Sequence, residues 1–295
     1  MKIVQYGIPR ITPALEHFDA VVTHIRKLGR QAQFEPWGAL ATRLAQVIDE
    51  RLRNDTNPAH TVEIYVGYAI AIGHLPGGHQ VDPWCSLWHN TFGADRVAAL
   101  APYFVRAALS QRSRHDRIRM AARLPRYLKY IQDSQLRSRA FDCCLDVAPD
   151  VMSRTFTIRL EAGIQALFVR ELADELAFRP EECRQFEFDR VADANDALPV
   201  EESNGPSIVL ARTIPLLPAI DDRPRAFRRI ADAADRNWAR VGAADSMMEL
   251  LEVLSRVIPT LPHDSQNAAV AQIIEIVDRR LPTAGRNLFF QILGL

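Results

Sequence analysis

The sequence predicts an all-α protein built from stacked helix pairs, and three observations carry that prediction. Apolar residues recur at a helical spacing through most of the 295 residues. Two ten-residue stretches are near copies of each other, and prolines punctuate the chain at intervals typical of one helix and its turn. With 48% apolar and 24% charged residues, the composition excludes extensive disorder, collagen and coiled coils.

The N-terminal part contains two clear amphipathic segments. Thr12 is a favourable N-cap and Pro13 a favourable first helical residue, and an apolar face continues from there to Leu28. A second helix is predicted from Trp37 to Leu52, where leucine, valine and isoleucine again share one face.

Two later stretches carry a strand signal instead. Apolar residues alternate strictly between 64 and 72, and more weakly over 155–160. An isolated strand is not stable without partners, and the neighbouring segments all have a helical pattern. We therefore predict that both stretches are helical.

The rest of the chain continues the helical pattern, with start signals such as Pro180 and Asp245. Pro125 should kink or split the segment that contains it, because proline removes a helical hydrogen bond. The predicted segments are 94–110, 114–131, 134–147, 155–177, 180–194, 207–216, 223–240, 245–258, 265–280 and 284–294.

The informative pattern is an internal repeat. Residues 209–218 (Val-Leu-Ala-Arg-Thr-Ile-Pro-Leu-Leu-Pro) and 253–262 (Val-Leu-Ser-Arg-Val-Ile-Pro-Thr-Leu-Pro) match at seven of ten positions, and a fainter copy begins at Arg123. A lone helix pair cannot cover its apolar faces, whereas stacked pairs bury a continuous core. The sequence therefore predicts an α-solenoid of stacked helix pairs with a period of about 44 residues. Ile214 and Ile258 should then occupy equivalent, buried positions.

This period lies in the range of known helical repeats. Over about 95–295 the chain resembles a HEAT/armadillo-like α-helical repeat protein, with 1–94 as a divergent N-terminal helical region. The resemblance implies a curved array with a concave binding surface. The proline-punctuated helices and the ratio of 33 arginines to 3 lysines also resemble SKWP-repeat type III effectors of plant-pathogenic bacteria, and the ratio is typical of a GC-rich bacterial genome.

Other features of the sequence indicate where a loop lies and in which cellular compartment the protein works. The acidic stretch 193–207 holds two prolines and a glycine, which predicts a loop or linker within the array. The four cysteines lack a disulfide-framework spacing, and Cys143 and Cys144 are predicted to be core residues. No signal peptide or membrane-spanning run is evident, so we expect a cytoplasmic protein without membrane association, or one delivered into a host cell if it is an effector.

One cluster of side chains could carry chemistry. His74, His79, Cys85 and His89 lie within 16 residues and are of the types that bind zinc. On a helix, Cys85 and His89 would lie one turn apart, which also permits a cysteine nucleophile with a histidine base. The spacing matches no standard zinc motif, so the alternative is a surface loop before a helix packed by tryptophans, with no cofactor. Phosphate-binding and hydrolase motifs are absent, which favours a non-catalytic protein.

Charge is balanced overall, with 36 basic and 36 acidic residues, but it is unevenly placed. Residues 106–139 hold ten basic and two acidic side chains, whereas 161–202 hold four and twelve. On a helical projection, four arginines form a stripe opposite the apolar face, and we predict that they are exposed and bind an acidic partner segment. The stripe consists of Arg112, Arg119, Arg123 and Arg126. The alternatives are a solvated face, or pairing of the two charged regions within the fold.

These observations favour a non-catalytic protein-binding scaffold or adaptor, for example a bacterial effector that engages a host protein through its arginine-rich face. One alternative is a zinc- or thiol-dependent enzyme that uses the cluster at 74–89. The other is nucleic-acid binding through 106–139, although the chain lacks the aromatic-interleaved basic motif of single-strand binders.

Overall fold

The fold follows from where proline, glycine and capping residues end each helix. The computed structural model describes residues 36–53, 62–91, 94–153, 163–241 and 244–281, together with Arg286 and Phe290. Within these residues the chain forms α-helices and short 3-10 helices, and no strand occurs among them. The all-α prediction is therefore confirmed. No helix in this described part is long and apolar enough to cross a membrane.

The chain divides into two compact units, residues 1–140 and 141–295. The division falls inside helix α8, whereas the predicted boundary at residue 94 concerns where the sequence repeat begins and stays a prediction. Unit 1 contains α2 (Pro36–Arg53), α3 (Val62–Gly73), η2 (Gly77–His79), α4 (Val81–His89), α5 (Ala94–Ser110), α6 (Arg114–Ala121), α7 (Pro125–Leu128) and the start of α8 (Ser134–Met152).

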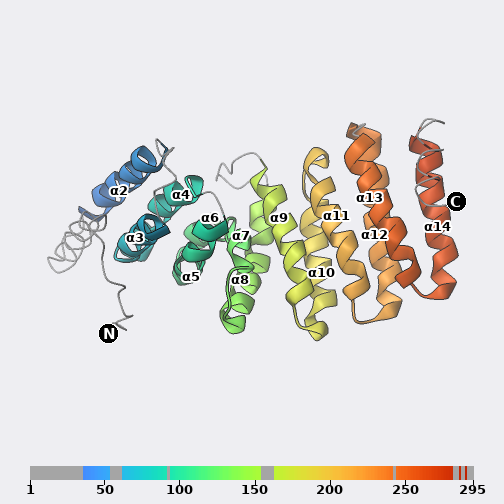
Figure 1. Cartoon of the computed structure of the whole chain (residues 1–295), viewed down its shortest axis with the longest axis horizontal. Coiled ribbons are helices and arrows are strands. Elements are labelled where there is room, and N and C mark those ends of the chain that lie inside the picture. The colour runs from blue at the N-terminus through green and yellow to red at the C-terminus, as the bar shows by residue number, and fades with distance from the viewer. Residues whose placement is uncertain are drawn as a thin grey trace. The chain divides into compact units, whose positions relative to one another are not determined.

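Unit 2 continues from α8 with α9 (Ile164–Glu175), η3 (Leu176–Phe178), α10 (Glu181–Asp196), η4 (Val200–Glu202), α11 (Asn204–Thr213) and η5 (Ile214–Leu216). It ends with η6 (Ile220–Asp222), α12 (Arg223–Val241), α13 (Ala244–Val257), η7 (Ile258–Thr260) and α14 (His263–Arg280). In Figure 1, α9 to α14 lie next to one another along this unit. The helices predicted over 13–28 and 284–294 and the stretch 155–160 lie outside the residues that the structure describes, apart from Arg286 and Phe290.

An aromatic core holds unit 1 together. Trp84 of α4 meets Phe104 of α5 edge-on, with ring centroids 5.2 Å apart, and Phe104 stacks on Tyr127 of α7 at 4.5 Å. All three side chains are fully buried. As expected, Pro125 splits the predicted helix 114–131, because α6 ends at Ala121 and α7 begins at the proline.

The alternating stretch 64–72 is helical, as predicted. Tyr65, Tyr68, Ala69 and Ile72 are buried at helical spacing, while Ile70 is exposed. Helix α3 packs against both α4 and α5, so the apolar residues on several of its faces are covered by helices.

Alternate helices contact each other in unit 2. Helix α11 packs against α9 and α13, and α12 packs against α14. The side chains of Ile208, Val209, Leu210 and Ala211 are buried in succession, so α11 is covered by neighbouring helices over several of its faces.

Ion pairs also join alternate helices of unit 2, namely α8 to α10 and α10 to α12. Arg190 of α10 reaches Asp146 of α8, at 3.7 Å. Arg229 of α12 binds Asp193 and Asp196 of α10, each at 2.6 Å. Arginines of α12 thus partly neutralise the acidic region 161–202.

The long loop expected over 193–207 is much shorter in the structure, which corrects that prediction. Helix α10 continues to Asp196 and α11 begins at Asn204. Buried polar side chains explain the difference: Asn195 Nδ2 donates to Ser207 Oγ at 2.9 Å, and Asn237 Nδ2 donates to Ser203 Oγ at 2.5 Å. These bonds satisfy polar groups that would otherwise favour a solvated loop.

The two near copies of the repeat fold alike locally but differ in burial. Ile214 and Ile258 each begin a 3-10 helix directly after an α-helix. Ile214 is fully buried, whereas Ile258 is partly exposed, so the prediction that both are buried is wrong for Ile258. Helix α11 packs extensively against both α9 and α13, whereas the contact of α13 with α14, the next helix, is much smaller.

Candidate functional site

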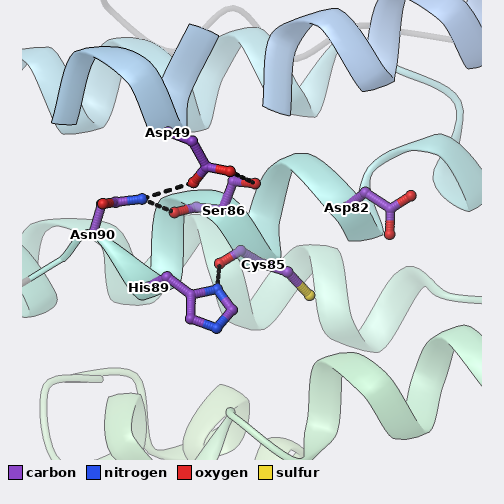
Figure 2. Close-up of a pocket in the computed structure, with 6 residues that line it drawn as sticks. All are labelled: Asp49, Asp82, Cys85, Ser86, His89 and Asn90. Atoms are coloured by element: carbon purple, nitrogen blue, oxygen red, sulfur yellow. Dashed lines mark hydrogen bonds between the residues drawn. The ribbon is translucent and has the colours of Figure 1, made fainter. Parts of the chain in front are cut away.

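Helix α4 presents two chemically different faces. Val81, Trp84, Leu87 and Trp88 are buried at helical spacing and anchor the helix in unit 1. The opposite face contributes polar side chains to an open pocket of about 530 Å³ (Figure 2). The pocket is lined by Asp49, Asp82, Cys85, Ser86, His89 and Asn90. As predicted, Cys85 and His89 lie one turn apart on the same face of a helix.

Asp49 enters the pocket from α2 and fixes that helix to α4. Its carboxylate accepts hydrogen bonds from Asn90 Nδ2 at 2.9 Å and from Ser86 Oγ at 3.3 Å. Asn90 Nδ2 also donates to the carbonyl of Ser86, at 2.8 Å. Sequence inspection missed these three residues because Asp49 lies 37 and 41 positions before its partners, and nothing in the local pattern joins them.

The orientation of His89 follows from its own helix. The Nδ1 atom lies 2.7 Å from the carbonyl oxygen of Cys85, and a carbonyl can only accept, so Nδ1 carries the proton. The ring also packs edge-on against Trp88, with centroids 5.3 Å apart. Because Nδ1 carries the proton, Nε2 is the ring nitrogen that keeps a lone pair.

Arg119 of α6 forms an ion pair with Asp82, one of the residues that line the pocket. Its Nη2 atom lies 2.6 Å from Oδ1 of Asp82. Burial alone would lower the pKa of this guanidinium, but the hydrogen bond to Asp82 and the nearby Cys85 raise it above its ordinary value. Arg119 is therefore a positive charge that α6 holds beside Asp82.

The four side chains proposed for zinc occupy three separate elements. His74 follows α3, His79 ends η2, and Cys85 and His89 lie on α4. Among the residues that the structure describes, no three His, Cys, Asp or Glu side chains are grouped so that they could hold a metal ion.

The predicted arginine stripe is only partly exposed, which corrects the prediction. Arg123 is 7% exposed, donates to the carbonyl of Arg119 at 2.8 Å and lies 5.3 Å from the ring centre of Trp88. Arg126 donates to the carbonyl of Thr91 at 3.0 Å and also faces Trp88. Their stems and guanidinium groups therefore pack on an aromatic ring from α4, a contact that a single-helix projection cannot reveal.

Three exposed arginines, of which Arg112 belongs to the predicted stripe, lie at the turn from α5 to α6 and in the helix that follows it. Arg112, Arg114 and Arg117 are exposed there, and we call this surface the basic edge of unit 1. Arg117 also braces the turn, because its Nε and Nη2 donate to the carbonyl of Gln111 at 3.4 and 3.1 Å. Ser113 caps α6 by accepting from the amide of Asp116.

Comparisons with protein-family models, with curated proteins and with solved structures find no match to this chain. The fold and the site therefore define only a structural class. The chain is an all-α protein in which unit 1 has a polar pocket on α4 and a basic edge.

Proposed function

We propose that this chain is a non-catalytic protein-binding scaffold of stacked helix pairs, and that the basic edge of unit 1 engages an acidic segment of a partner protein. The observation that carries the proposal is the exposure of Arg112, Arg114 and Arg117 around one braced turn, where Asp116 is the acidic neighbour. Guanidinium groups bind carboxylates in a bidentate manner and hold them better than ammonium groups do.

The repeat part of the proposal, that of a HEAT/armadillo-like α-solenoid, has independent support. In unit 2 alternate helices pack together, and Arg–Asp pairs join α8 to α10 and α10 to α12. Both copies of the Ile-Pro segment form the same α-helix to 3-10 helix junction. Stacked helix pairs give this combination because each pair repeats its contacts with the next.

The pocket supports a structural role more than a catalytic one. The carboxylate of Asp49 accepts hydrogen bonds from Ser86 and Asn90, and the imidazole Nδ1 of His89 donates to a backbone carbonyl. These bonds tie α2 to α4 and fix the last turn of α4.

The test measures binding of a fluorescent Glu/Asp-rich peptide to the full chain and to the variant Arg112→Glu/Arg114→Glu. Each exposed ion pair contributes about 0.2–1 kcal/mol, so reversal of both charges should weaken binding by about tenfold. Raising sodium chloride from about 100 to about 500 mM should weaken binding to the unmodified chain as well, because salt screens exposed charges.

The matched control is Arg170→Glu/Arg228→Glu, which reverses two exposed arginines of unit 2. It should bind the acidic peptide as the unmodified chain does. Equal binding by the Arg112→Glu/Arg114→Glu variant would overturn the proposal. Preferential binding of duplex DNA with a steep salt dependence would assign the basic edge to nucleic acid instead.

A further inference from the structure

Three turns of unit 2 are joined side by side by two arginines. Arg184 donates through Nη2 to the carbonyl of Arg179 at 2.8 Å and through Nη1 to the carbonyl of Leu216 at 2.5 Å. Arg223 donates to the carbonyl of Leu217 through Nε and Nη2, and to that of Thr260 through Nη1 at 3.0 Å. The turns that follow α9, α11 and α13 therefore form one edge of unit 2 (Figure 1).

Large apolar side chains are exposed on this edge. Phe178 is 67% exposed, Ile220 50% and Leu216 40%. All three lie in the short 3-10 helices η3, η5 and η6, where the backbone turns back towards the next helix. Exposed apolar residues that cluster on braced backbone typically mark an interaction surface.

Carboxylates occur next to these turns in the chain. Acidic residues occupy the first turn of α10, η6 and α14. They are Glu181, Glu182, Asp221, Asp222 and Asp264. None of the five forms an ion pair or side-chain hydrogen bond within the part of the chain that the structure describes.

The acids further along α10 behave differently. Asp189 binds Arg225 at 2.7 Å, and Asp193 and Asp196 both bind Arg229. Acidic residues in a first turn also favour helix formation, because they lie near the positive end of the helix dipole. That effect accounts for the position of the carboxylates but not for the exposed Phe178 and Ile220 beside them.

We propose that this surface, the apolar edge of unit 2, binds a protein segment whose apolar side chains are flanked by lysine or arginine. Phe178, Leu216 and Ile220 would cover the apolar side chains, and the first-turn carboxylates would pair with the flanking cations. The charge of the partner follows from that of the edge, where five carboxylates outnumber the two arginines already bound to carbonyls. This partner is opposite in charge to the one proposed for the basic edge.

The test uses three synthetic helical peptides of matched length, with binding to the full chain followed by fluorescence anisotropy. One carries leucine and phenylalanine with lysine flanks, the second has glutamate flanks, and the third keeps the lysines but has serine in place of the apolar residues. Only the first should bind tightly. High salt should weaken its binding only severalfold, because apolar burial is not screened.

The variant Phe178→Ser/Leu216→Ser/Ile220→Ser should lower affinity for the first peptide by at least about tenfold, given the stabilisation from burying one large apolar side chain. Glu181→Gln/Glu182→Gln/Asp221→Asn should lower affinity severalfold and reduce its dependence on salt. The control Tyr103→Ser removes an exposed aromatic side chain of unit 1 and should bind as the unmodified chain does.

Unchanged binding by the triple serine variant, with its helical content intact by circular dichroism, would overturn the proposal. Equal binding of the glutamate-flanked peptide would overturn the choice of partner. A dimer in sedimentation that the triple variant abolishes would assign the edge to a second copy of the chain. The variant Arg112→Glu/Arg114→Glu should bind the lysine-flanked peptide normally, so failure of the basic-edge proposal remains distinguishable.

Discussion

The turn before α6 in unit 1 and the turn before α12 in unit 2 use the same backbone brace. Arg117 and Arg223 each donate through Nε and Nη2 to the carbonyl six residues earlier. The two turns nevertheless present opposite surfaces, since the first exposes arginines and the second exposes Leu216 and Ile220 beside carboxylates. The same arginine-to-carbonyl bonds can therefore fix the backbone of two turns whose exposed side chains differ in charge and polarity.

The two edges also differ in what lies beneath them. Below the edge of unit 2, Arg179 and Glu187 form a buried pair, with Nη2 at 2.6 Å from Oε1. Near the edge of unit 1, Arg119 pairs with Asp82, whose carboxylate is largely exposed. Removal of one partner lowers the free energy of unfolding more for a buried ion pair than for an exposed one. The remaining charge of an exposed pair is hydrated by water, whereas that of a buried pair is not.

The largest effect is expected for Arg179→Ala. The substitution leaves the carboxylate of Glu187 buried without its cation and also removes the contact with the ring of Phe141. We expect the free energy of unfolding to fall by about 3–5 kcal/mol, measured by urea denaturation. The matched change Arg119→Ala should cost less than about 1 kcal/mol. Similar losses for the two variants would contradict the distinction between the edges.

A smaller difference is expected between the two braces. Arg223 joins its own turn to that of Thr260, whereas the bonds of Arg117 go to its own turn. We expect Arg223→Ala to lower the free energy of unfolding by about 2 kcal/mol and Arg117→Ala by about 1 kcal/mol. Arg225→Ala, which removes an exposed ion pair with Asp189, is the control and should change it by less than about 0.5 kcal/mol.

Hydrogen exchange locates the effect of each brace. The Arg223→Ala variant should expose amides of the turns after both α11 and α13, since the arginine contacts both. Faster exchange confined to the first of these turns would contradict the idea that arginines join the edge of unit 2 into one surface.

Much of this helical framework could be predicted from periodicity and punctuation alone. The bounds of α5 and the split at Pro125 matched because apolar spacing and proline act over a few residues. Burial of Arg123 could not be predicted in this way, because its contact, Trp88, lies on another helix. The position of Asp49 in the pocket likewise depends on how α2 packs against α4, which local sequence does not encode.

The same limit applies to the edges. Charge counts indicated that 106–139 is basic and 161–202 is acidic. They did not indicate which of these side chains would form ion pairs within the fold. Within the part of the chain that the structure describes, Asp189 and Asp193 of α10 pair with arginines of α12, while the acids of its first turn form no ion pair. Helix face does not separate the two groups, because Glu182 lies seven residues before Asp189 and therefore on the same face. What separates them is their position along the helix.

The smallest effect on the free energy of unfolding at neutral pH is expected for Tyr127→Phe. At alkaline pH the same variant tests whether the stability of each unit depends on its own buried ionisable side chain. Burial raises the pKa of Tyr127 in unit 1, and burial likewise raises the pKa of Cys144 in unit 2. Among the residues that the structure describes, the hydroxyl of Tyr127 is buried without a hydrogen-bond partner. Its removal breaks no hydrogen bond, so the free energy of unfolding at pH 7 should stay the same or rise slightly.

The sign of the alkaline effect follows from proton uptake. Above the ordinary pKa of tyrosine, about 10, the unfolded chain loses the proton that the folded Tyr127 retains, so stability falls by about 1.4 kcal/mol per pH unit. The stabilising contribution is complete below that pH and is lost as pH rises towards the raised pKa of the folded state. Cys144 follows the same rule from about pH 9. Tyr127→Phe should therefore flatten the alkaline loss of hydrogen-exchange protection in unit 1, and Cys144→Ala that in unit 2. A single variant that flattened both would mean that the two units unfold together.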